Sequence, residues 1–270
     1  MAFAKKVIAT NDESIEDLFI PSTELHRVPG CKLGVHALAG VGKTFFCCTA
    51  KKPIYFIDTE NSARMITKNF PESEAKNIRV LEVLKFVERK GTEEKIDYGK
   101  SLQATMVAIN KLMDLIETTK EGEEGTIVID SASDIWEWLK QWLMEQKDLK
   151  YTASGYMMQT EWAKPNKRWA DFLVTLKSCR WHVILTFKSR AEYDCKGQRL
   201  DSNTAIWQGQ TEFVWNNIGE LLPDGNGGNK FFLRKTRDGK QANPNVDVVD
   251  NPSWYDIIKM LEDRSGLKYV

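Results

Sequence analysis

Short apolar runs alternate along the chain with longer segments in which apolar residues recur every three or four positions. Short apolar runs are typical of strands that are buried on both faces, whereas the longer period is typical of helices that cover a sheet. The expected strands cover residues 33–38, 54–58, 78–83, 126–130 and 181–187. This order predicts an α/β fold with a mostly parallel sheet and helices on both of its faces.

Helical patterns fill the intervals between these strands. The clearest one covers residues 101–118, where apolar residues form a stripe along one face. Three further helices are expected to begin at Lys43, near Ser133 and near Trp162. Because each helix pattern joins two strand patterns, the connections are those of a parallel sheet.

The pattern of apolar and polar residues changes in the C-terminal part. After residue 212, short strand patterns are separated by turns at residues 224–228 and 238–239, and a last helix is expected over residues 252–265. Short strands joined by tight turns favour antiparallel additions at one edge of the sheet. Since no linker or internal repeat interrupts the chain, we expect an N-terminal extension over residues 1–30 and a single domain over residues 31–270.

The composition indicates what class of protein carries this fold and in which compartment we expect it. The 270 residues are 42% hydrophobic and 28% charged, as in globular proteins, and no apolar run reaches the roughly 20 residues that span a bilayer. The N-terminus lacks the apolar core of a secretory signal, and the five cysteines lack the spacing of a zinc site or a disulfide framework. These features predict a protein of the cytoplasm with reduced thiols.

The sequence Ala-Leu-Ala-Gly-Val-Gly-Lys-Thr at residues 37–44 has Walker A spacing, with alanine in place of the usual first glycine. Such a loop wraps phosphates with backbone N–H groups; Lys43 should reach the β- and γ-phosphates, and Thr44 should ligate Mg²⁺. The alternative is a chance Gly-rich turn, but the strand before the loop and the helix after it favour nucleotide binding. The expected nucleotide-binding residues are Ala37, Leu38, Ala39, Gly40, Val41, Gly42, Lys43, Thr44 and Phe45.

Two acidic residues follow other apolar strands. Asp130 ends the strand 126–130 in the Walker B form and is the expected second Mg²⁺ ligand, while Glu60 follows the strand 54–58. Because ligands gather at the carboxyl ends of parallel strands, both side chains should project toward the phosphate loop. Glu60 is our candidate to orient or deprotonate the attacking water.

These strand ends resemble a known family. The segments 55–60 and 127–131 are similar to the corresponding strands of RecA-superfamily recombinases, in which the glutamate after the second strand is catalytic. Lys-Thr-Arg-Asp-Gly at residues 235–239 resembles a segment of RadA- and DnaB-type ATPases whose basic residues reach the nucleotide of the neighbouring subunit. The resemblance thus implies catalytic roles for Lys235 and Arg237, beside Lys43 and Glu60.

The strongest resemblance is to compact phage-type RecA-like ATPases linked to single-strand annealing and recombination. It rests on Ile-Asp-Ser at 129–131, the Trp-rich helix that follows, and Leu-Thr-Phe-Lys at 185–188, and it extends over roughly residues 30–265. It implies a RecA-like P-loop NTPase core, and a host-cell cytoplasm if the gene belongs to a phage. Thr186 and Lys188, at the end of a strand, are candidates to sense the γ-phosphate.

Two segments of mixed basic and aromatic composition are expected to bind nucleic acid. Residues 145–199 hold 11 lysines and arginines against 6 acidic residues. In the RecA-like arrangement, the loops that line the DNA path correspond to residues 147–168 and 188–210, where cations can neutralise phosphates and rings can stack on bases. The alternative is a solvated charged face with the aromatic rings packed beneath it. The expected DNA-binding residues are Lys164, Lys167, Arg168, Lys188, Arg190, Lys196 and Arg199.

The sequence therefore predicts an ATP-dependent single-stranded DNA-binding protein of recombination, annealing or repair, with DNA-stimulated ATP hydrolysis between subunits. ATP and Mg²⁺ are the expected cofactors. The expected partners are single-stranded DNA, further copies of the chain in a ring or filament, and a single-strand DNA-binding protein. Two alternatives stay open: a translocating helicase or packaging motor, and a nucleotide-gated scaffold with slow turnover and no DNA binding.

Overall fold

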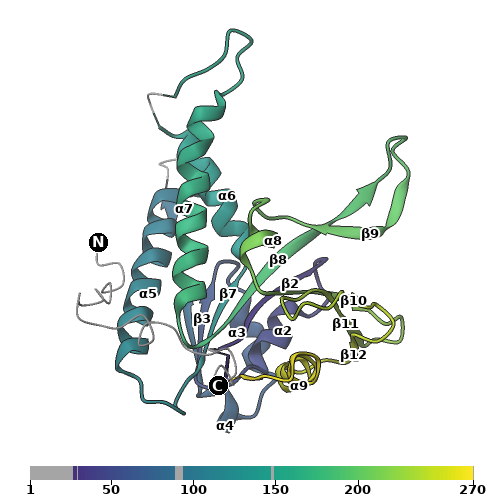
Figure 1. Ribbon diagram of the computed structural model, residues 1–270. Helices are drawn as coiled ribbons and strands as arrows, with labels where there is room; N and C mark the ends of the chain where they lie inside the picture. The colour runs from purple at the N-terminus through teal and green to yellow at the C-terminus, as the bar shows by residue number, and fades with distance from the viewer. Residues whose placement is uncertain (1–26, 29, 89–93, 147–148, 270) are drawn as a thin grey trace, which may run out of the picture.

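The computed structural model describes residues 27–28, 30–88, 94–146 and 149–269 (Figure 1). Its centre is a nine-stranded sheet with the order β12-β11-β10-β2-β8-β7-β3-β4, in which β9 pairs with β8 outside this path. Along the part of this path from β10 to β4, each strand pairs in parallel with the next. Their bounds are Lys32–Ala37 for β2, Ile54–Asp58 for β3, Ile78–Glu82 for β4, Thr126–Asp130 for β7, His182–Tyr193 for β8 and Asn217–Pro223 for β10.

Helices cover both faces of this sheet. One layer consists of α5, α6 and α7, and the opposite layer contains α2 and α9 (Figure 1). Along β7, Ile127 and Ile129 pack toward the first layer and Val128 packs toward the second, because successive side chains of a strand point to opposite faces. The longer helices are α5 at Tyr98–Thr118, α6 at Ala132–Met144, α7 at Gln159–Ser178 and α9 at Trp254–Ser265, and α2 covers Lys43–Cys48.

Antiparallel strands extend the sheet beyond β10. Strand β11 (Asn229–Lys235) pairs antiparallel with β10, and β12 (Val248–Asp250) pairs antiparallel with β11. The fold class predicted from the sequence is therefore confirmed: a mostly parallel sheet with helices on both faces and antiparallel additions at the C-terminal edge. Shorter elements are β1 at Arg27–Val28, β5 at Phe86–Glu88, β6 at Glu94–Ile96, β13 at Lys268–Tyr269, α3 at Ala63–Thr67, α4 at Glu72–Ala75 and α8 at Thr211–Val214.

Strand β8 is longer than the sequence predicts and ends far from the sheet. Its second half pairs only with β9 (Arg199–Ala205), and the two form a hairpin, here called the arm, that projects from the body of the molecule (Figure 1). The expected loop 188–210 is therefore largely strand. The tip turns at Asp194, whose carboxylate accepts the backbone N–H groups of Lys196 and Gln198 at 2.8 Å, and at Gly197, whose φ of 79° suits glycine.

Helix α7 also begins earlier than predicted. It starts at Gln159, so Lys164, Lys167 and Arg168, which the sequence placed in a loop, lie on the first turns of the helix. Pro165 is the seventh residue of this helix and has no N–H group to donate to the carbonyl of the residue four positions earlier, Glu161. Helices α6 and α7 form a second projection, separate from the arm (Figure 1). Among the described residues, no helix is long and apolar enough to cross a membrane.

Candidate active site

The phosphate loop connects β2 to α2, as the sequence predicts. Gly40 and Gly42 have φ angles of 80° and 94°, a region that residues with a Cβ rarely adopt, so glycine is required at both positions. Nothing lies within 4 Å of the position that a Cβ would take at Gly40, and the loop is open on that side. The N–H groups at the start of α2 thus face a concave, accessible turn, which is the local structure that binds phosphate.

Lys43 folds back over this loop. Its ammonium donates to the carbonyls of Ala37 and Leu38, both at 3.1 Å. Burial lowers the pKa of Lys43, while the nearby carboxylates of Asp130 and Glu60 raise it. The side chain therefore lies inside the site next to two acids, where a bound phosphate chain would be its stronger partner.

Asp130 is the buried centre of the site. Its side chain accepts hydrogen bonds from the hydroxyl of Thr44, at 2.6 Å, and from the hydroxyl of Thr186. Burial raises the pKa of Asp130, and the two hydroxyl donors lower it in part. Strand β8 lies between β2 and β7, so Thr186 reaches Asp130 from the neighbouring strand. One carboxylate and one hydroxyl in contact fit Mg²⁺, which takes one or two protein oxygens and keeps several waters.

Glu60 stands at the rim of the site in an ion pair. Its carboxylate lies 3.0 Å from the ammonium of Lys188, which also donates to Asp134 at 2.6 Å. Burial alone would lower the pKa of Lys188, but these two carboxylates outweigh it and raise the pKa. Asp58 has a structural role instead, because its carboxylate accepts the backbone N–H groups of Glu60 and Ala63 at 3.0 and 2.8 Å.

Asp134 is a residue of the site that the sequence did not reveal. Besides Lys188, it accepts hydrogen bonds from the hydroxyls of Thr59 and Ser131, both at 2.9 Å, and so ties together the loops after β3 and β7. The available signal was its place in the first turn of α6, four residues after Asp130 at the end of β7. Asp134 is not part of a Walker motif, so the sequence pattern did not single it out.

Lys235 and Arg237 are held together at α8. Lys235 donates to the backbone carbonyls of Glu212 and Trp215, and Arg237 donates to that of Phe213. Lys177 of α7 donates to the carbonyl of Val214 at 3.0 Å, so three cations meet at the end of this helix. Burial, followed by the charge of Arg237, lowers the pKa of both lysines.

These cations lie away from the phosphate loop of their own chain. Lys235 pairs with Ile218 near the start of β10, whereas Asn229 pairs with Pro223 at the end of β10. The loop follows the carboxyl end of β2, which is parallel to β10. Lys235 is six residues from Asn229 along β11, which corresponds to a separation of about 20 Å at about 3.3 Å per residue. Strand β11 ends at Lys235, so Arg237 belongs to the turn that follows and not to the expected strand.

The expected DNA-binding residues fall into two groups that the structure does not bring to one place. On α7, Lys164 pairs with Glu161 at 3.0 Å and Arg168 stacks over the Trp142 ring at 4.0 Å. The other group follows β8 into the arm. Lys167, Arg190 and Lys196 are exposed, Lys188 belongs to the site above, and the side chain of Arg199 lies outside the described residues.

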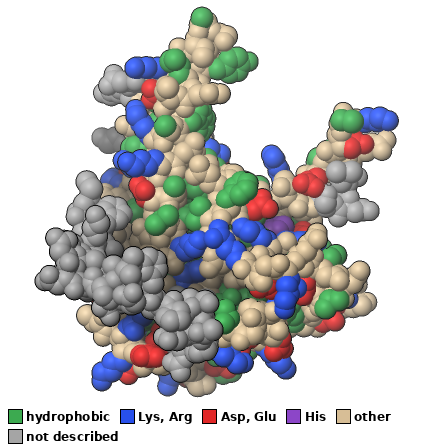
Figure 2. All heavy atoms as spheres, viewed as in Figure 1, with side chains coloured by type: hydrophobic (Ala, Val, Ile, Leu, Met, Phe, Trp, Pro, Cys, Tyr) green, Lys and Arg blue, Asp and Glu red, His purple; other side chains and the backbone are tan. Residues whose placement is uncertain are grey.

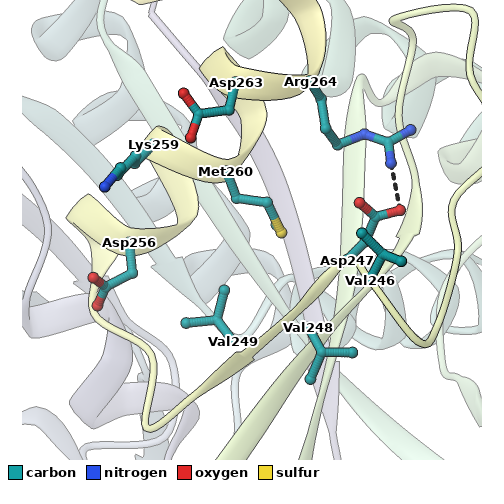
Figure 3. Close-up of a pocket in the computed structure, with 9 residues that line it drawn as sticks. All are labelled: Val246, Asp247, Val248, Val249, Asp256, Lys259, Met260, Asp263 and Arg264. Carbon is teal, nitrogen blue, oxygen red and sulfur yellow. Dashed lines mark hydrogen bonds and ion pairs between the residues drawn. The ribbon is translucent and has the colours of Figure 1, made fainter.

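Basic side chains also gather between the two projections. Figure 2 shows lysines and arginines near the centre of this face, between the helix pair and the base of the arm. A groove of about 500 Å³ lies elsewhere, between β12 and α9, and none of the phosphate-loop residues line it (Figure 3). Two of the three acids that line it have other partners, because Asp247 pairs with Arg264 and Asp256 caps α9 through Ser253.

A phosphate loop between a buried strand and a helix, with a hydroxyl and a buried acid in contact beside it, defines a P-loop NTPase. Comparison with known families agrees. The AAA domain family matches residues 30–215, more than half of the chain, and this chain therefore belongs to the AAA domain family. No curated protein matches the chain. The match supports nucleotide binding and ATPase activity, and the family generally uses ATP and Mg²⁺.

Proposed function

We propose that this AAA-domain ATPase is an oligomeric, ATP-dependent single-stranded DNA-binding protein that acts in recombination, annealing or repair. The observation that carries the proposal is the continuity of β8. This one strand contributes Thr186 and Lys188 to the nucleotide site and then continues into the arm with Arg190 and Tyr193. A ligand bound along the arm therefore acts on the strand that holds Asp130 and Glu60.

The arm has the side chains that a single strand of nucleic acid requires. Arg190 and Lys196 are exposed cations, and Tyr193 exposes 62% of its surface. Exposed cations neutralise phosphates, and exposed rings stack on unpaired bases without regard to sequence. An exposed tyrosine on a hairpin with no core to cover argues against the alternative in which the rings only pack under the loops.

The chemistry of hydrolysis follows from the contacts of the site. ATP with Mg²⁺ would supply the phosphates and the metal charge, for which Lys43 and the pair of Thr44 and Asp130 are the partners. Glu60 is positioned at the rim to accept a proton from water, but its carboxylate is occupied by Lys188 at 3.0 Å. We infer that Glu60 acts as a base only when Lys188 is drawn away, which couples hydrolysis to the arm.

Lys235 and Arg237 are proposed to serve the nucleotide site of a neighbouring subunit. Their position at the end of β11 remote from the phosphate loop leaves them without access to their own site. Cations supplied in trans stabilise the charge that develops on a transferred phosphoryl group. Hydrolysis would then require assembly of a ring or filament.

The test is the rate of ATP hydrolysis with and without single-stranded DNA, at low and high salt. We expect stimulation by DNA that fades as salt rises, because phosphate contacts release counterions. The variant Arg190→Ala/Lys196→Ala should keep the basal rate and lose the stimulation. The matched control is Lys68→Ala/Lys76→Ala, which removes two exposed charges beside α3 and α4.

The outcome also separates the competing functions. A basal rate that DNA does not change in the wild-type protein would refute DNA coupling and favour the nucleotide-gated scaffold. Stimulation accompanied by ATP-driven strand displacement would favour the translocating motor. Stimulation that the arm variant retains in full would show that DNA binds elsewhere.

A further inference from the structure

The turn between β10 and β11 lies beside the phosphate loop. Strand β10 is parallel to β2, with Glu220 opposite His36, so the carboxyl ends of both strands reach the same edge of the sheet. The turn at residues 224–228 follows β10 at that edge, and Asn229 begins β11 directly after it. These residues lie outside the matched span 30–215.

Asn229 contacts the phosphate loop through its side chain. Its amide nitrogen Nδ2 lies 2.9 Å from the position that a Cβ would take at Gly42. The backbone of Asn229 is fixed separately by Asn251, which accepts its N–H at 3.0 Å and donates to its carbonyl at 2.6 Å. Among the hydrogen bonds of the described residues, none engages the carboxamide of Asn229. A polar group with two donors and an acceptor thus stands free next to Gly42.

The direction of a bound nucleotide follows from the sheet order. The groups suited to the terminal phosphate and its metal, Glu60 and Asp130, follow β3 and β7, on one side of β2. A nucleotide whose phosphate end is held on that side must extend its nucleoside toward the other side. There β10 and β11 follow, and Asn229 is the free polar side chain that touches the loop.

We propose that the carboxamide of Asn229 binds the adenine base of the nucleotide. Adenine offers a 6-amino donor next to a ring-nitrogen acceptor, and a carboxamide offers the complementary acceptor and donor. The inference rests on the nucleotide binding that is part of the proposed function, and it is independent of DNA. It gives the C-terminal strands a specific task, the choice of base, which the phosphate loop cannot perform because it contacts only phosphates.

The test compares ligands that share phosphates but differ in the base. The full-length protein is titrated with ATP, with purine riboside triphosphate, which lacks the 6-amino group, and with inorganic tripolyphosphate. Wild-type protein should bind ATP about fivefold more tightly than the purine analogue, the scale of one hydrogen bond. Asn229→Ala should weaken the binding of ATP by about tenfold and leave the binding of tripolyphosphate unchanged. It should also abolish the preference for ATP over the analogue.

Two further variants control this experiment. Asn226→Ala removes the same side chain from an exposed position of the same turn and should leave all three affinities unchanged. Asn229→Asp keeps the size and an acceptor for the 6-amino group but removes the donor, so it should retain part of the preference for ATP over the analogue. Equal melting temperatures of both Asn229 variants and the wild-type protein establish that the fold is intact, as expected since the contacts with Asn251 use the backbone of Asn229.

The possible results test the base contact of Asn229 separately from nucleotide binding itself. If wild-type protein binds ATP and tripolyphosphate but Asn229→Ala changes neither, the base contact is refuted and the nucleotide site stands. If Asn229→Ala weakens tripolyphosphate as much as ATP, Asn229 binds phosphate and the proposal is overturned. If the wild-type protein binds neither ligand while Lys43→Ala behaves identically, the nucleotide site is refuted together with the inference.

Discussion

Replacing Thr186 with valine tests how Asp130 is kept charged inside the protein. Thr186 and Asp130 are both buried, and the Thr186 hydroxyl donates to the Asp130 carboxylate. Valine has nearly the same shape but no donor. A hydrogen bond to a buried charged group contributes about 1.5–3 kcal/mol, so we expect Thr186→Val to lower the free energy of unfolding by about 2 kcal/mol at neutral pH.

The matched control is Thr126→Val in the adjacent strand. Thr126 is equally buried, but its hydroxyl donates at 2.7 Å to the neutral carbonyl of Lys51. Its loss should cost about 1 kcal/mol, the usual contribution of a neutral hydrogen bond. Comparing the two variants separates the effect of the charge from the general effect of placing valine in a buried strand.

The pH dependence distinguishes the two variants further. The pKa of Asp130 is raised in the folded state, so the buried carboxylate destabilises the fold at high pH, and this cost disappears as pH falls through the raised pKa. Thr186→Val removes a donor that favours the charged form and raises the pKa again. The destabilisation by Thr186→Val should therefore shrink as pH falls, whereas that by Thr126→Val should stay constant.

Urea unfolding at a series of pH values, from about pH 7.5 down to the most acidic pH at which the protein stays folded, measures both effects. The reasoning is refuted if Thr186→Val is no more destabilising than Thr126→Val at the highest pH. It is also refuted if the loss caused by Thr186→Val does not shrink anywhere in this range, because protonation of Asp130 would then not remove the contribution of the hydroxyl.

Three further predictions concern turnover. Lys43→Ala should abolish tight ATP binding and hydrolysis, and unchanged ATPase activity in a pure preparation would remove the phosphate-loop assignment. Glu60→Gln should retain ATP binding but slow hydrolysis by about 100-fold or more; loss of binding would instead make Glu60 a structural or metal-holding acid. Arg237→Ala should bind nucleotide and lose most turnover, and mixing it with Lys43→Ala should restore part of the activity. Absence of recovery in demonstrated mixed oligomers, or full activity of Arg237→Ala as a monomer, would contradict a role in trans.

The sequence predicts the parts of the fold in which local pattern and packing agree. Strands β3 and β7 are apolar on both faces, because the sheet is covered twice, and their bounds follow directly from the run of residues. Walker spacing likewise predicts the contact of Thr44 with Asp130, since chemistry fixes which residues must meet there.

Other features depend on contacts that no local pattern encodes. The second half of β8 is mixed in polarity and becomes strand only because β9 pairs with it, so the sequence suggests a loop. The sequence marks Lys188 as a candidate phosphate sensor and as a DNA-binding residue, but its ion pairs with Glu60 and Asp134 are contacts between distant segments that only the structure reveals. Most of the strands of the parallel sheet lie between Gly42 and Asn229 in the sequence, although the two residues are close in space. The hydrophobic pattern of the sequence does not predict a contact between two single residues so far apart along the chain.

The pairing of β8 also divides this strand into two halves of different local stability. From Lys32 to Ala37, β2 pairs with β8 as far as Lys188, and beyond that residue only β9 is a neighbour. Backbone amides bonded between two buried strands exchange with solvent at rates close to those of global unfolding, while a two-stranded ribbon opens locally at far lower cost. The limit between slow and fast exchange should fall at Lys188. Lys188, which forms the ion pair with Glu60, is thus the last residue held by the central sheet. The segment that follows it can open and close while the rest of the protein stays folded.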